Sequence, residues 1–531
     1  MTGQPCATSS PRAIARRLAR RWLAPAVAAG GAASLWIVGC HGPDMPAQVY
    51  GVALFRHYGF VLWDTGWYGG HYQASYSVLA PVLGALLGIY GAFVVTAAIA
   101  AWAFDRLVEP VLGNRARAVT LLFSVGTVVP VAIGQLPFLS GEALGLVALL
   151  AARRRRPVLA VLAALTCALL SEVAAAFLVL VLVAWAVTRP RSARSRLLAL
   201  AAVTALPVVA FALLLPGLGP FPFLGPDLAV VLAVCAVGVA VLPARYHAVR
   251  IGLVLYALTA IVVFLVPNPL GGNVGRLAED FAPPLALAFA SVPRRRAFAL
   301  LAVPLLVWQW VPAVAAVAPA AGDPSAHASY YAPLIRYLTG QAVIGRVEIP
   351  FTRDHWEAAY VAPHVPMARG WERQLDTVDN PIFYQAAPLT SREYHAWLDH
   401  SSVTWIALPD TAFDYSARAE VHVIASAPSY LRPVWHDAHW KVWRVVGSPG
   451  LVSGPATLVR FGATGFAVDA RRPGVVTVRV RYTRLWQVTS GDACIQEPGS
   501  SVWTKVVVHR PGRVTVGTSL LGSSQDCDAG P

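Results

Sequence analysis

Residues 146–170 read LVALLAARRRRPVLAVLAALTCALL, with four consecutive arginines, Arg153–Arg156, between two uncharged apolar runs. Here an apolar segment ends in an arginine cluster, and the chain then enters a second apolar segment at once. This pattern is typical of two membrane helices joined on the cytoplasmic side. The reason is that positively charged loops stay inside. This stretch therefore predicts a polytopic α-helical membrane protein.

The same pattern extends over more than half of the chain. About eleven apolar segments follow one another, at 22–40, 78–104, 118–134, 139–152, 157–171, 173–188, 197–215, 227–243, 249–267, 278–293 and 297–317. The N-terminal segment and every second connection hold 21 arginines, whereas the other connections hold only Arg56 and Arg276. We therefore expect a multi-pass plasma-membrane protein with a cytoplasmic N-terminus and, after an odd number of crossings, an extracytoplasmic C-terminal region.

Composition agrees with this class of protein. Of 531 residues, 56% are hydrophobic and 13% charged, and the mean hydropathy is +0.57. The net charge of +15 comes largely from loop arginines, which we attribute to topology and contact with anionic membrane lipids rather than to nucleic acid. Lys441 and Lys505 are the only lysines, a bias typical of a high-GC, actinobacteria-like genome.

Some of the segments are shorter than the ~20 residues that a membrane-spanning helix needs. Residues 157–187 lie between two arginine clusters, so this stretch must leave the cytoplasmic side and return to it. A tight hairpin with Ser171 and Glu172 at its outer tip meets both conditions. Such short helices are tolerated where protein or a watery cavity covers their free backbone groups.

The chain divides into four predicted regions. Residues 1–21 are expected to be a cytoplasmic segment, followed by a retained first helix because no signal cleavage site stands out. Residues 22–320 form the membrane domain and include a long first outer loop, 41–77. An extracytoplasmic α/β domain is expected at 321–448, and a β-sandwich with a C-terminal tail at 449–531, where hydrophobic residues alternate with period two.

The first outer loop is where we expect chemistry. It reads HGPDMPAQVYGVALFRHYGFVLWDTGWYGGHYQASYS and holds two carboxylates, Asp44 and Asp64. Carboxylates beside a lipid boundary are costly unless they are used or paired. The residues around Asp64 have flat faces and polar edges that suit a sugar ring: Trp63, Trp67, Tyr68, His71 and Tyr72. An interfacial aromatic belt with solvated aspartates is the alternative reading.

Four polar residues near the outer ends of other segments are further substrate-binding candidates. They are Gln135, Glu142, Glu172 and Arg276. A buried carboxylate near the outer end of a membrane helix is a candidate functional residue. The alternative is that it lies at a helix end that faces water and has no functional role. Arg276 breaks the positive-inside pattern and suits a bidentate phosphate contact, unless it forms an ion pair with Glu279 or Asp280.

Cysteine and histidine usage indicates a disulfide but no zinc site. Cys494 and Cys527 are the cysteines of the outer region, and we expect them to pair in an oxidising compartment. The histidines of that region have no ligand-like spacing, so no zinc site is expected. No cofactor is implied with certainty, and a divalent metal ion is left open. No Walker-type motif occurs.

An arginine-rich start, one helix and a long outer loop with an early Asp resemble the GT-C class of membrane glycosyltransferases. The Trp63-Asp64 pair, the Trp67-Tyr68-Gly69-Gly70 run and the outer C-terminal region add to the likeness. The chain is also similar to bacterial membrane proteins grouped as "6-pyruvoyl-tetrahydropterin synthase related". The resemblance covers mainly residues 20–320, with a weaker likeness at 370–376.

The resemblance implies transfer of a sugar from a polyprenyl-phosphate donor to a cell-envelope glycan or glycolipid, by an inverting hexosyl- or pentosyltransferase. The carboxylate of the family's first loop maps best onto Asp44, which would be the general base, with Asp64 as the second candidate. A base is needed to take the acceptor proton while the phosphate leaves as an anion. The second outer acidic residue of the family has no clear counterpart here, and Glu142 is the nearest.

Two other functions remain open at this point. The first is a non-catalytic envelope protein that binds or assembles partners through its outer region. The second is a secondary transporter, which is less favoured because ionisable residues in the middle of helices and signs of an inverted repeat are lacking.

Overall fold

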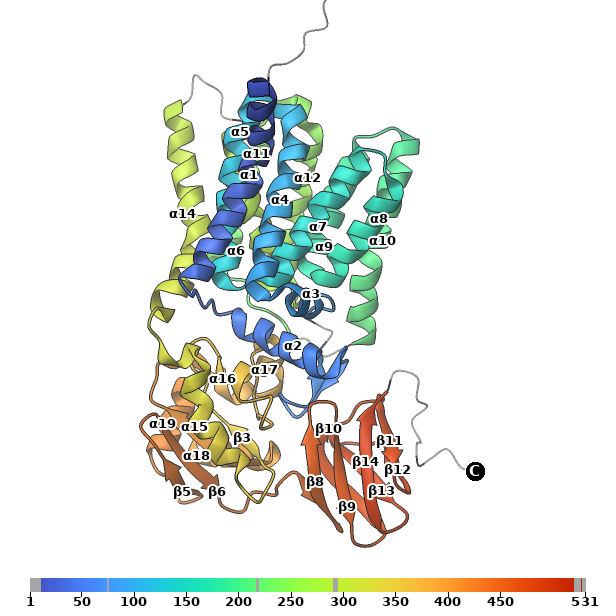
Figure 1. Ribbon diagram of the computed structural model, residues 1–531, viewed down its shortest axis with the longest axis vertical. Coiled ribbons are helices and arrows are strands. Elements are labelled where there is room, and N and C mark those ends of the chain that lie inside the picture. The colour runs from blue at the N-terminus through green and yellow to red at the C-terminus, as the bar shows by residue number, and fades with distance from the viewer. Residues whose placement is uncertain (1–10, 74–75, 216–218, 290–294, 520–526, 528–531) are drawn as a thin grey trace, which may run out of the picture. The chain divides into compact units, whose positions relative to one another are not determined.

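The computed structural model describes residues 11–73, 76–215, 219–289, 295–519 and 527, and the side chains of 11–21 and 289–302 are left aside. The predicted cytoplasmic segment, residues 1–21, thus lies outside the described side chains. The chain forms two compact units (Figure 1). We call residues 1–40, 86–210 and 222–316 the helical unit, and residues 41–85, 211–221 and 317–531 the mixed unit.

Each predicted apolar segment contains a helix. In chain order they are α1 (Pro11–Ile37), α4 (Ile89–Leu112), α5 (Ala116–Gly126), α6 (Val128–Ile133), α7 (Leu136–Arg153), α8 (Pro157–Leu170), α9 (Glu172–Val187), α10 (Arg191–Leu214), α11 (Gly225–Val241), α12 (His247–Leu265), α13 (Arg276–Phe289) and α14 (Arg295–Ala320). Segment 78–104 is broken by Gly88 into α3 (Ala80–Leu87) and α4, and Gly88 has a φ of +71°. Glycine adopts that backbone conformation without steric cost, so the helix ends there.

The predicted number of about eleven membrane spans is not confirmed. Five helical stretches of the described residues are long and apolar enough to cross a membrane: Ile89–Ile133, Leu136–Arg153, Arg191–Leu214, Ala244–Leu265 and Val303–Ala320. Four further apolar helices are shorter: Trp22–Ile37, Pro157–Leu170, Glu172–Val187 and Gly225–Val241. The 14 residues of α8 rise only about 21 Å, against a hydrocarbon core of about 30 Å.

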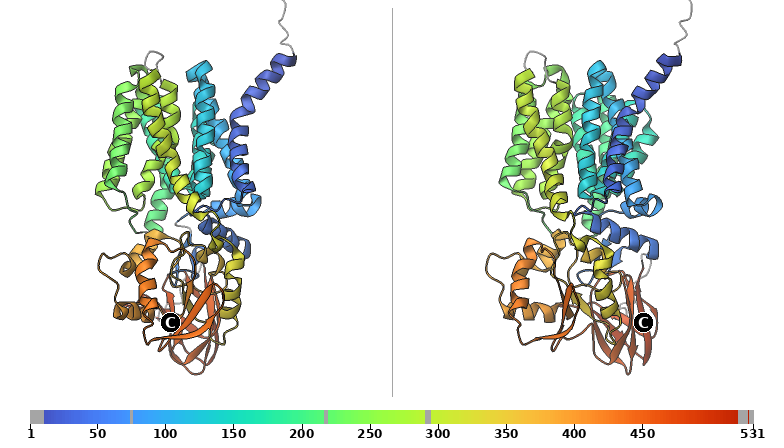
Figure 2. Two further views of the ribbon diagram at one scale, coloured as in Figure 1. Left: turned by 90° about the vertical axis from the view of Figure 1, so that its left-hand side faces the viewer. Right: turned by 60° about the vertical axis from the view of Figure 1, so that its left-hand side comes forward.

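Small residues let these helices pack closely. Helix α4 packs against both α1 and α7, and its alanines Ala92, Ala97 and Ala100 are fully buried. A Cβ atom added to Gly31 of α1 would lie 2.5 Å from Val128. Such close approach through small side chains is how membrane helices gain van der Waals contact when no hydrophobic effect separates helix from lipid. Figure 2 shows the helices of this unit running side by side.

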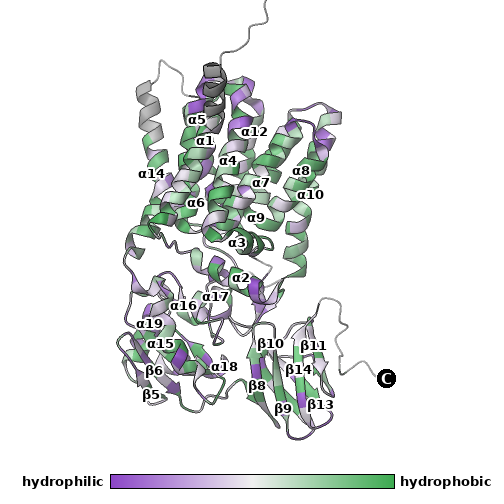
Figure 3. Cartoon of the chain, viewed as in Figure 1, coloured by the Kyte–Doolittle hydropathy of each residue, from purple (hydrophilic) through white to green (hydrophobic). Residues whose placement is uncertain are grey.

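The arginine-rich connections share one end of the helical unit. Arg154–Arg156 separate α7 from α8, and residues 188–190 join α9 to α10, which carries Arg191, Arg194 and Arg196 in its first turns. Because α8 and α9 form the predicted tight hairpin, these two connections lie together, opposite Ser171 at its tip. The Ser171 hydroxyl caps α9 by accepting a hydrogen bond from the backbone N–H of Ala174. Figure 3 shows hydrophobic residues along these helices and hydrophilic ones at this end.

The mixed unit contains a four-stranded sheet in the order β3-β4-β6-β5. Its strands are β3 (Arg346–Glu348), β4 (Val403–Pro409), β5 (Leu431–His436) and β6 (Trp440–Val445), and only β3 and β4 run parallel. The accompanying helices are α15 (Ala328–Thr339), α16 (Glu357–Tyr360), α17 (Arg373–Asp379), α18 (Ser391–His400) and α19 (Arg418–Ala425). Helices and strands therefore alternate along this part of the mixed unit.

Two antiparallel four-stranded sheets follow, in the orders β12-β13-β10-β7 and β11-β14-β9-β8. Their strands are β7 (Val452–Ser453), β8 (Ala456–Gly462), β9 (Gly465–Ala470), β10 (Gly474–Arg481), β11 (Trp486–Ser490), β12 (Ala493–Gln496), β13 (Trp503–Val508) and β14 (Gly512–Thr518). Along β10, Val476, Val478 and Val480 are fully buried while the residues between them are more exposed. That period of two is what a strand of a sandwich requires.

Residues 41–77, which the sequence predicts as the first outer loop, are not part of the helical unit. They fold into α2 (Met45–Tyr58) and a short hairpin of β1 (Trp63–Asp64) and β2 (His71–Tyr72) within the mixed unit. Backbone hydrogen bonds join them to residues about 300 to 400 positions away: Met367 N–H donates to Gly66 O at 2.9 Å, and Arg481 N–H donates to Gly69 O at 2.7 Å. The predicted region 22–320 therefore differs from the helical unit at residues 41–85, 211–221 and 317–320.

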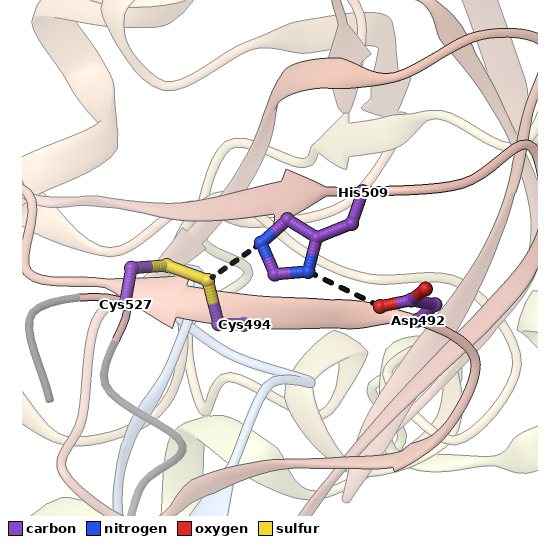
Figure 4. The surroundings of a disulfide bond; sticks show 4 residues. All are labelled: Asp492, Cys494, His509 and Cys527. Atoms are coloured by element: carbon purple, nitrogen blue, oxygen red, sulfur yellow. Dashed lines mark hydrogen bonds and ion pairs between the residues drawn. A yellow bond between two sulfur atoms is a disulfide. The ribbon is translucent and has the colours of Figure 1, made fainter. Parts of the chain in front are cut away.

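Cys494 and Cys527 form a disulfide, with their Cα atoms 5.3 Å apart (Figure 4). The bond ties residue 527 to β12. His509 lies beside it, with Nε2 3.6 Å from the Cys494 sulfur and Nδ1 3.1 Å from Oδ1 of Asp492.

Candidate functional site

Asp44 lies at the start of α2, in the N-cap position. Its carboxylate is half-buried and makes no capping hydrogen bond to the first turn of the helix. Aspartate is favoured in this position, and the helix N-terminus stabilises a negative charge there. Local sequence therefore explains both where the helix begins and why a carboxylate is tolerated at this point.

An aromatic and amide cluster surrounds the backbone at Asp44. The indole N–H of Trp371 donates to Pro43 O at 2.9 Å, and its ring lies 5.5 Å from the ring of Tyr76. The side-chain amide of Gln48 donates to the Tyr76 hydroxyl oxygen at 3.3 Å. We call Asp44, Gln48, Tyr76 and Trp371 the Asp44 cluster. Flat rings with polar edges beside a carboxylate suit the recognition of a sugar ring.

Asp64 has a different environment. It is fully buried, and both carboxylate oxygens accept hydrogen bonds: from the Tyr50 hydroxyl at 2.7 Å and from the Gly66 N–H at 3.0 Å. His71 Nδ1 lies 4.0 Å away. Burial raises the pKa of Asp64, and His71, Tyr50 and Gly66 oppose that rise. This carboxylate is fully engaged in holding α2 to the β1–β2 hairpin.

The aromatic residues that follow Asp64 separate into two groups. Trp67 and Tyr68 are buried: Trp67 stacks between Tyr50 and His71, and the Tyr68 hydroxyl donates to Gly370 O at 2.7 Å. Their rings therefore pack in the core of the mixed unit and have no free face for a ligand. In contrast, Trp63, His71 and Tyr72 border a cavity of about 430 Å³ within the same unit.

In the helical unit, Glu142 and Arg276 come together. Glu142 on α7 is 8% exposed, and its Oε1 has no hydrogen-bond partner among the described residues. It lies within electrostatic range of Asp280 on α13, which is 7% exposed. The Arg276 guanidinium lies 5.1 Å from the ring centre of Phe138, one turn before Glu142. A buried acidic pair beside an arginine is an uncommon arrangement among apolar helices, so these residues remain candidates for a functional site.

The two other predicted residues of this unit lie at helix starts. Gln135 takes the N-cap position of α7, and Glu172 is in the first turn of α9. Both are partly buried. Within the described part of the chain, no three His, Cys, Asp or Glu side chains converge as a metal site would require.

Sequence reasoning missed several members of these sites. Trp371 lies in a run in which only a weak likeness was visible, and nothing in the sequence shows that it reaches Pro43. The sequence indicates Asp280 only as a possible ion-pair partner of Arg276. Tyr50 lies six positions after Asp44 in an apolar stretch, and only the folded hairpin reveals its bond to Asp64.

Together these features define a protein of membrane-helix type that carries an α/β sheet, a β-sandwich and a carboxylate-aromatic cluster. No known family matches the sequence, and no curated protein does. Among solved structures, the chain is similar to the arabinofuranosyltransferase AftD from mycobacteria, with a TM-score of 0.46 and 18% sequence identity. The alignment covers 88% of this chain and 41% of that protein, so the chain spans about two fifths of its length.

Proposed function

We propose that this chain is a membrane glycosyltransferase of the GT-C class, which moves a sugar from a polyprenyl-phosphate donor to an extracytoplasmic envelope acceptor. The resemblance of its first outer loop and helix pattern to that class is the basis of the proposal. The observation that carries it is a difference in burial between two carboxylates: Asp64 is fully buried, whereas Asp44 is partly exposed and lies beside Trp371 and Tyr76.

In this account Asp44 is the general base. It takes the proton of an acceptor hydroxyl, whose oxygen forms a bond to the anomeric carbon of the donor sugar. The bond between that carbon and the phosphate oxygen breaks on the opposite side, and polyprenyl phosphate leaves with the electron pair. Stereochemistry at the anomeric carbon is inverted. General-base assistance of this kind contributes typically about 10²–10⁴ in rate.

Asp64 then has a positioning role. Its bonds to Tyr50 and Gly66 fix the hairpin against α2, the helix that begins at Asp44. In the helical unit, Arg276 is the proposed contact for the donor phosphate, because a guanidinium matches phosphate geometry and Phe138 supports its face. Glu142 is proposed to bind sugar hydroxyls through its unpartnered oxygen.

The orientation is also part of the proposal. The arginine-rich connections would face the cytoplasm, and the C-terminal part of the mixed unit would be extracytoplasmic. The acceptor would then be a glycan or glycolipid of the cell envelope.

Incubating the purified full-length protein with a panel of radiolabelled polyprenyl-phosphate sugars and envelope glycolipids tests the activity. We expect label to move to acceptor from at least one donor. No transfer from any donor, in protein that is folded, would argue for the alternative of a non-catalytic binding protein. The cavity at Trp63 and Tyr72 is the observation that favours that alternative.

A further inference from the structure

The mixed unit contains a second feature that the proposed reaction does not use. A cavity of about 430 Å³ opens between the β1–β2 hairpin, the end of β10, the last turn of α17 and the loop of residues 497–502, which joins β12 to β13. None of the residues of the Asp44 cluster lines it. Its volume is within the range of about 300–1,000 Å³ that small-molecule sites occupy.

Trp63 borders the cavity with its ring, whereas its indole N–H is buried. The residue is 6% exposed, and this N–H finds no acceptor among the described residues. A buried polar group without a hydrogen bond costs on the order of 1–3 kcal/mol. The Trp63 ring lies directly against Gly70, where an added Cβ atom would be 2.7 Å from the indole nitrogen. Glycine at position 70 therefore allows this tryptophan to lie at the cavity wall.

A second wall of the cavity is charged, because Arg481 and Asp379 line it. Arg481 is held by three contacts: its backbone N–H bonds to Gly69 O at 2.7 Å, its Nε donates to Tyr68 O at 2.9 Å, and its Nη2 is 3.2 Å from Oδ1 of Asp379. Polar groups that are fixed before a ligand arrives bind it at a lower entropic cost. Arg481 and Asp379 thus present an oriented donor and acceptor side by side.

Charge decides between classes of ligand. The cationic Arg481 is already matched by Asp379, and the remaining charged residue at the cavity is Glu497, which is exposed. A phosphate or uronate would meet this uncompensated carboxylate. A neutral polyol would instead use both kinds of group, because each of its hydroxyls can donate to a carboxylate and accept from a guanidinium N–H.

Aromatic side chains also line the cavity. Tyr72 and Tyr482 border the cavity and are partly exposed, and Tyr72 meets Trp63 edge-on with ring centres 4.8 Å apart. Aromatic faces accept the C–H side of a sugar ring, while the polar groups bind its hydroxyls. We propose that this cavity is a binding site for a short neutral oligosaccharide, separate from the site of transfer. Its role as the holder of a non-reacting part of the acceptor rests on the proposed function, whereas the binding itself does not.

Titration calorimetry of the full-length protein with short neutral oligosaccharides of pentose and hexose units, in the absence of donor, tests the site. We expect at least one of them to bind more tightly than a uronic-acid oligosaccharide of the same length. Trp63→Phe keeps an aromatic side chain but removes the five-membered ring of the indole, so it reduces the aromatic surface at the cavity and should weaken binding roughly 3- to 10-fold. Trp435→Phe, on β5 and outside the cavity, is the matched control and should bind normally.

Since Trp63 is part of the sandwich core, Glu497→Gln provides a second test at an exposed position and should also weaken binding of the neutral sugar. The proposal is overturned if no neutral oligosaccharide binds, if the uronate binds more tightly, or if both variants bind like the wild type. Asp44→Asn should bind the oligosaccharide normally. A protein that binds it but transfers no sugar from any donor would contradict the proposed function and leave the cavity assignment in place.

Discussion

The hydroxyl of Tyr50 on α2 donates a 2.7 Å hydrogen bond to Oδ2 of Asp64 on β1, and both residues are buried. This single contact joins the helix that begins at Asp44 to the hairpin that borders the cavity. It also explains why a conspicuous acidic residue among aromatics is a structural element of the first outer loop.

We predict that Tyr50→Phe destabilises the protein without abolishing turnover. The change removes the donor and leaves a buried carboxylate oxygen unsatisfied, which costs on the order of 1–3 kcal/mol. A thermal melt of the full-length protein in detergent should show a lower Tm. Tyr58→Phe, at an exposed position of the same helix, is the control and should melt like the wild type. An unchanged Tm for Tyr50→Phe would remove the structural role that we assign to the Tyr50–Asp64 contact.

Stability should fall as the pH rises from about 5 to 8, in part because of Glu372. Burial raises the pKa of Glu372 to about 7, against the opposing effect of His71. In the folded state Glu372 therefore keeps its proton at pH values where the unfolded chain has already lost it. Its contribution to the stability of the fold is present at low pH and is lost as the pH rises through 7. Glu372→Gln should flatten the dependence of Tm on pH, whereas the exposed Glu497→Gln should not. A steep dependence that survives in Glu372→Gln would show that other groups are responsible.

We expect the disulfide between Cys494 and Cys527 to be present in protein isolated from the envelope. It closes a segment of 33 residues, and the chain-entropy account gives about 3–4 kcal/mol for a loop of that length. Mass spectrometry of unreduced protein should find one linked peptide pair, and replacing both cysteines by serine should lower the Tm by several degrees. Two freely alkylated thiols in the native protein would contradict this prediction.

The topology can be tested separately from any chemistry. The N-terminal segment and every second connection hold 21 arginines, whereas the other connections hold two. This asymmetry predicts an extracytoplasmic C-terminus. A C-terminal fusion to alkaline phosphatase, which matures only outside the cytoplasm, should be active, and a fusion at the loop of Arg153–Arg156 should not. The opposite result would invert the orientation.

The helices of the fold were readable from the sequence because membrane helices are local structures. An apolar run flanked by arginines specifies where each helix lies, and the α8–α9 hairpin follows from Arg156 and Arg189 alone. The period of two along Val476, Val478 and Val480 likewise predicts a strand without knowledge of its partners. The sequence does not specify how many residues of each helix lie in lipid. The number of membrane spans therefore could not be predicted from it.

The site was less predictable because it depends on contacts across the chain. Asp44 and Asp64 look alike in the sequence, each a single carboxylate in a polar loop. The structure sets Asp64 apart by its full burial and by the hydrogen bonds that it accepts from Tyr50 and Gly66. Trp67 and Tyr68 resemble a sugar platform in composition, yet their partners lie about 300 positions away, at Ala358 and Gly370, and bury them.

The assignment of Asp44 as the base is tested most directly by single-turnover sugar transfer from the donor identified in the panel, with donor binding measured in parallel. Asp44→Asn keeps the size of the side chain and removes the basic oxygen, so transfer should fall by about 10²–10⁴ while donor binding is retained. Asp399→Asn, at a partly exposed site on α18, is the control and should transfer normally. Near-normal transfer by Asp44→Asn would contradict the central claim, and loss of transfer in Asp64→Asn protein that melts like the wild type would assign the base to Asp64 instead.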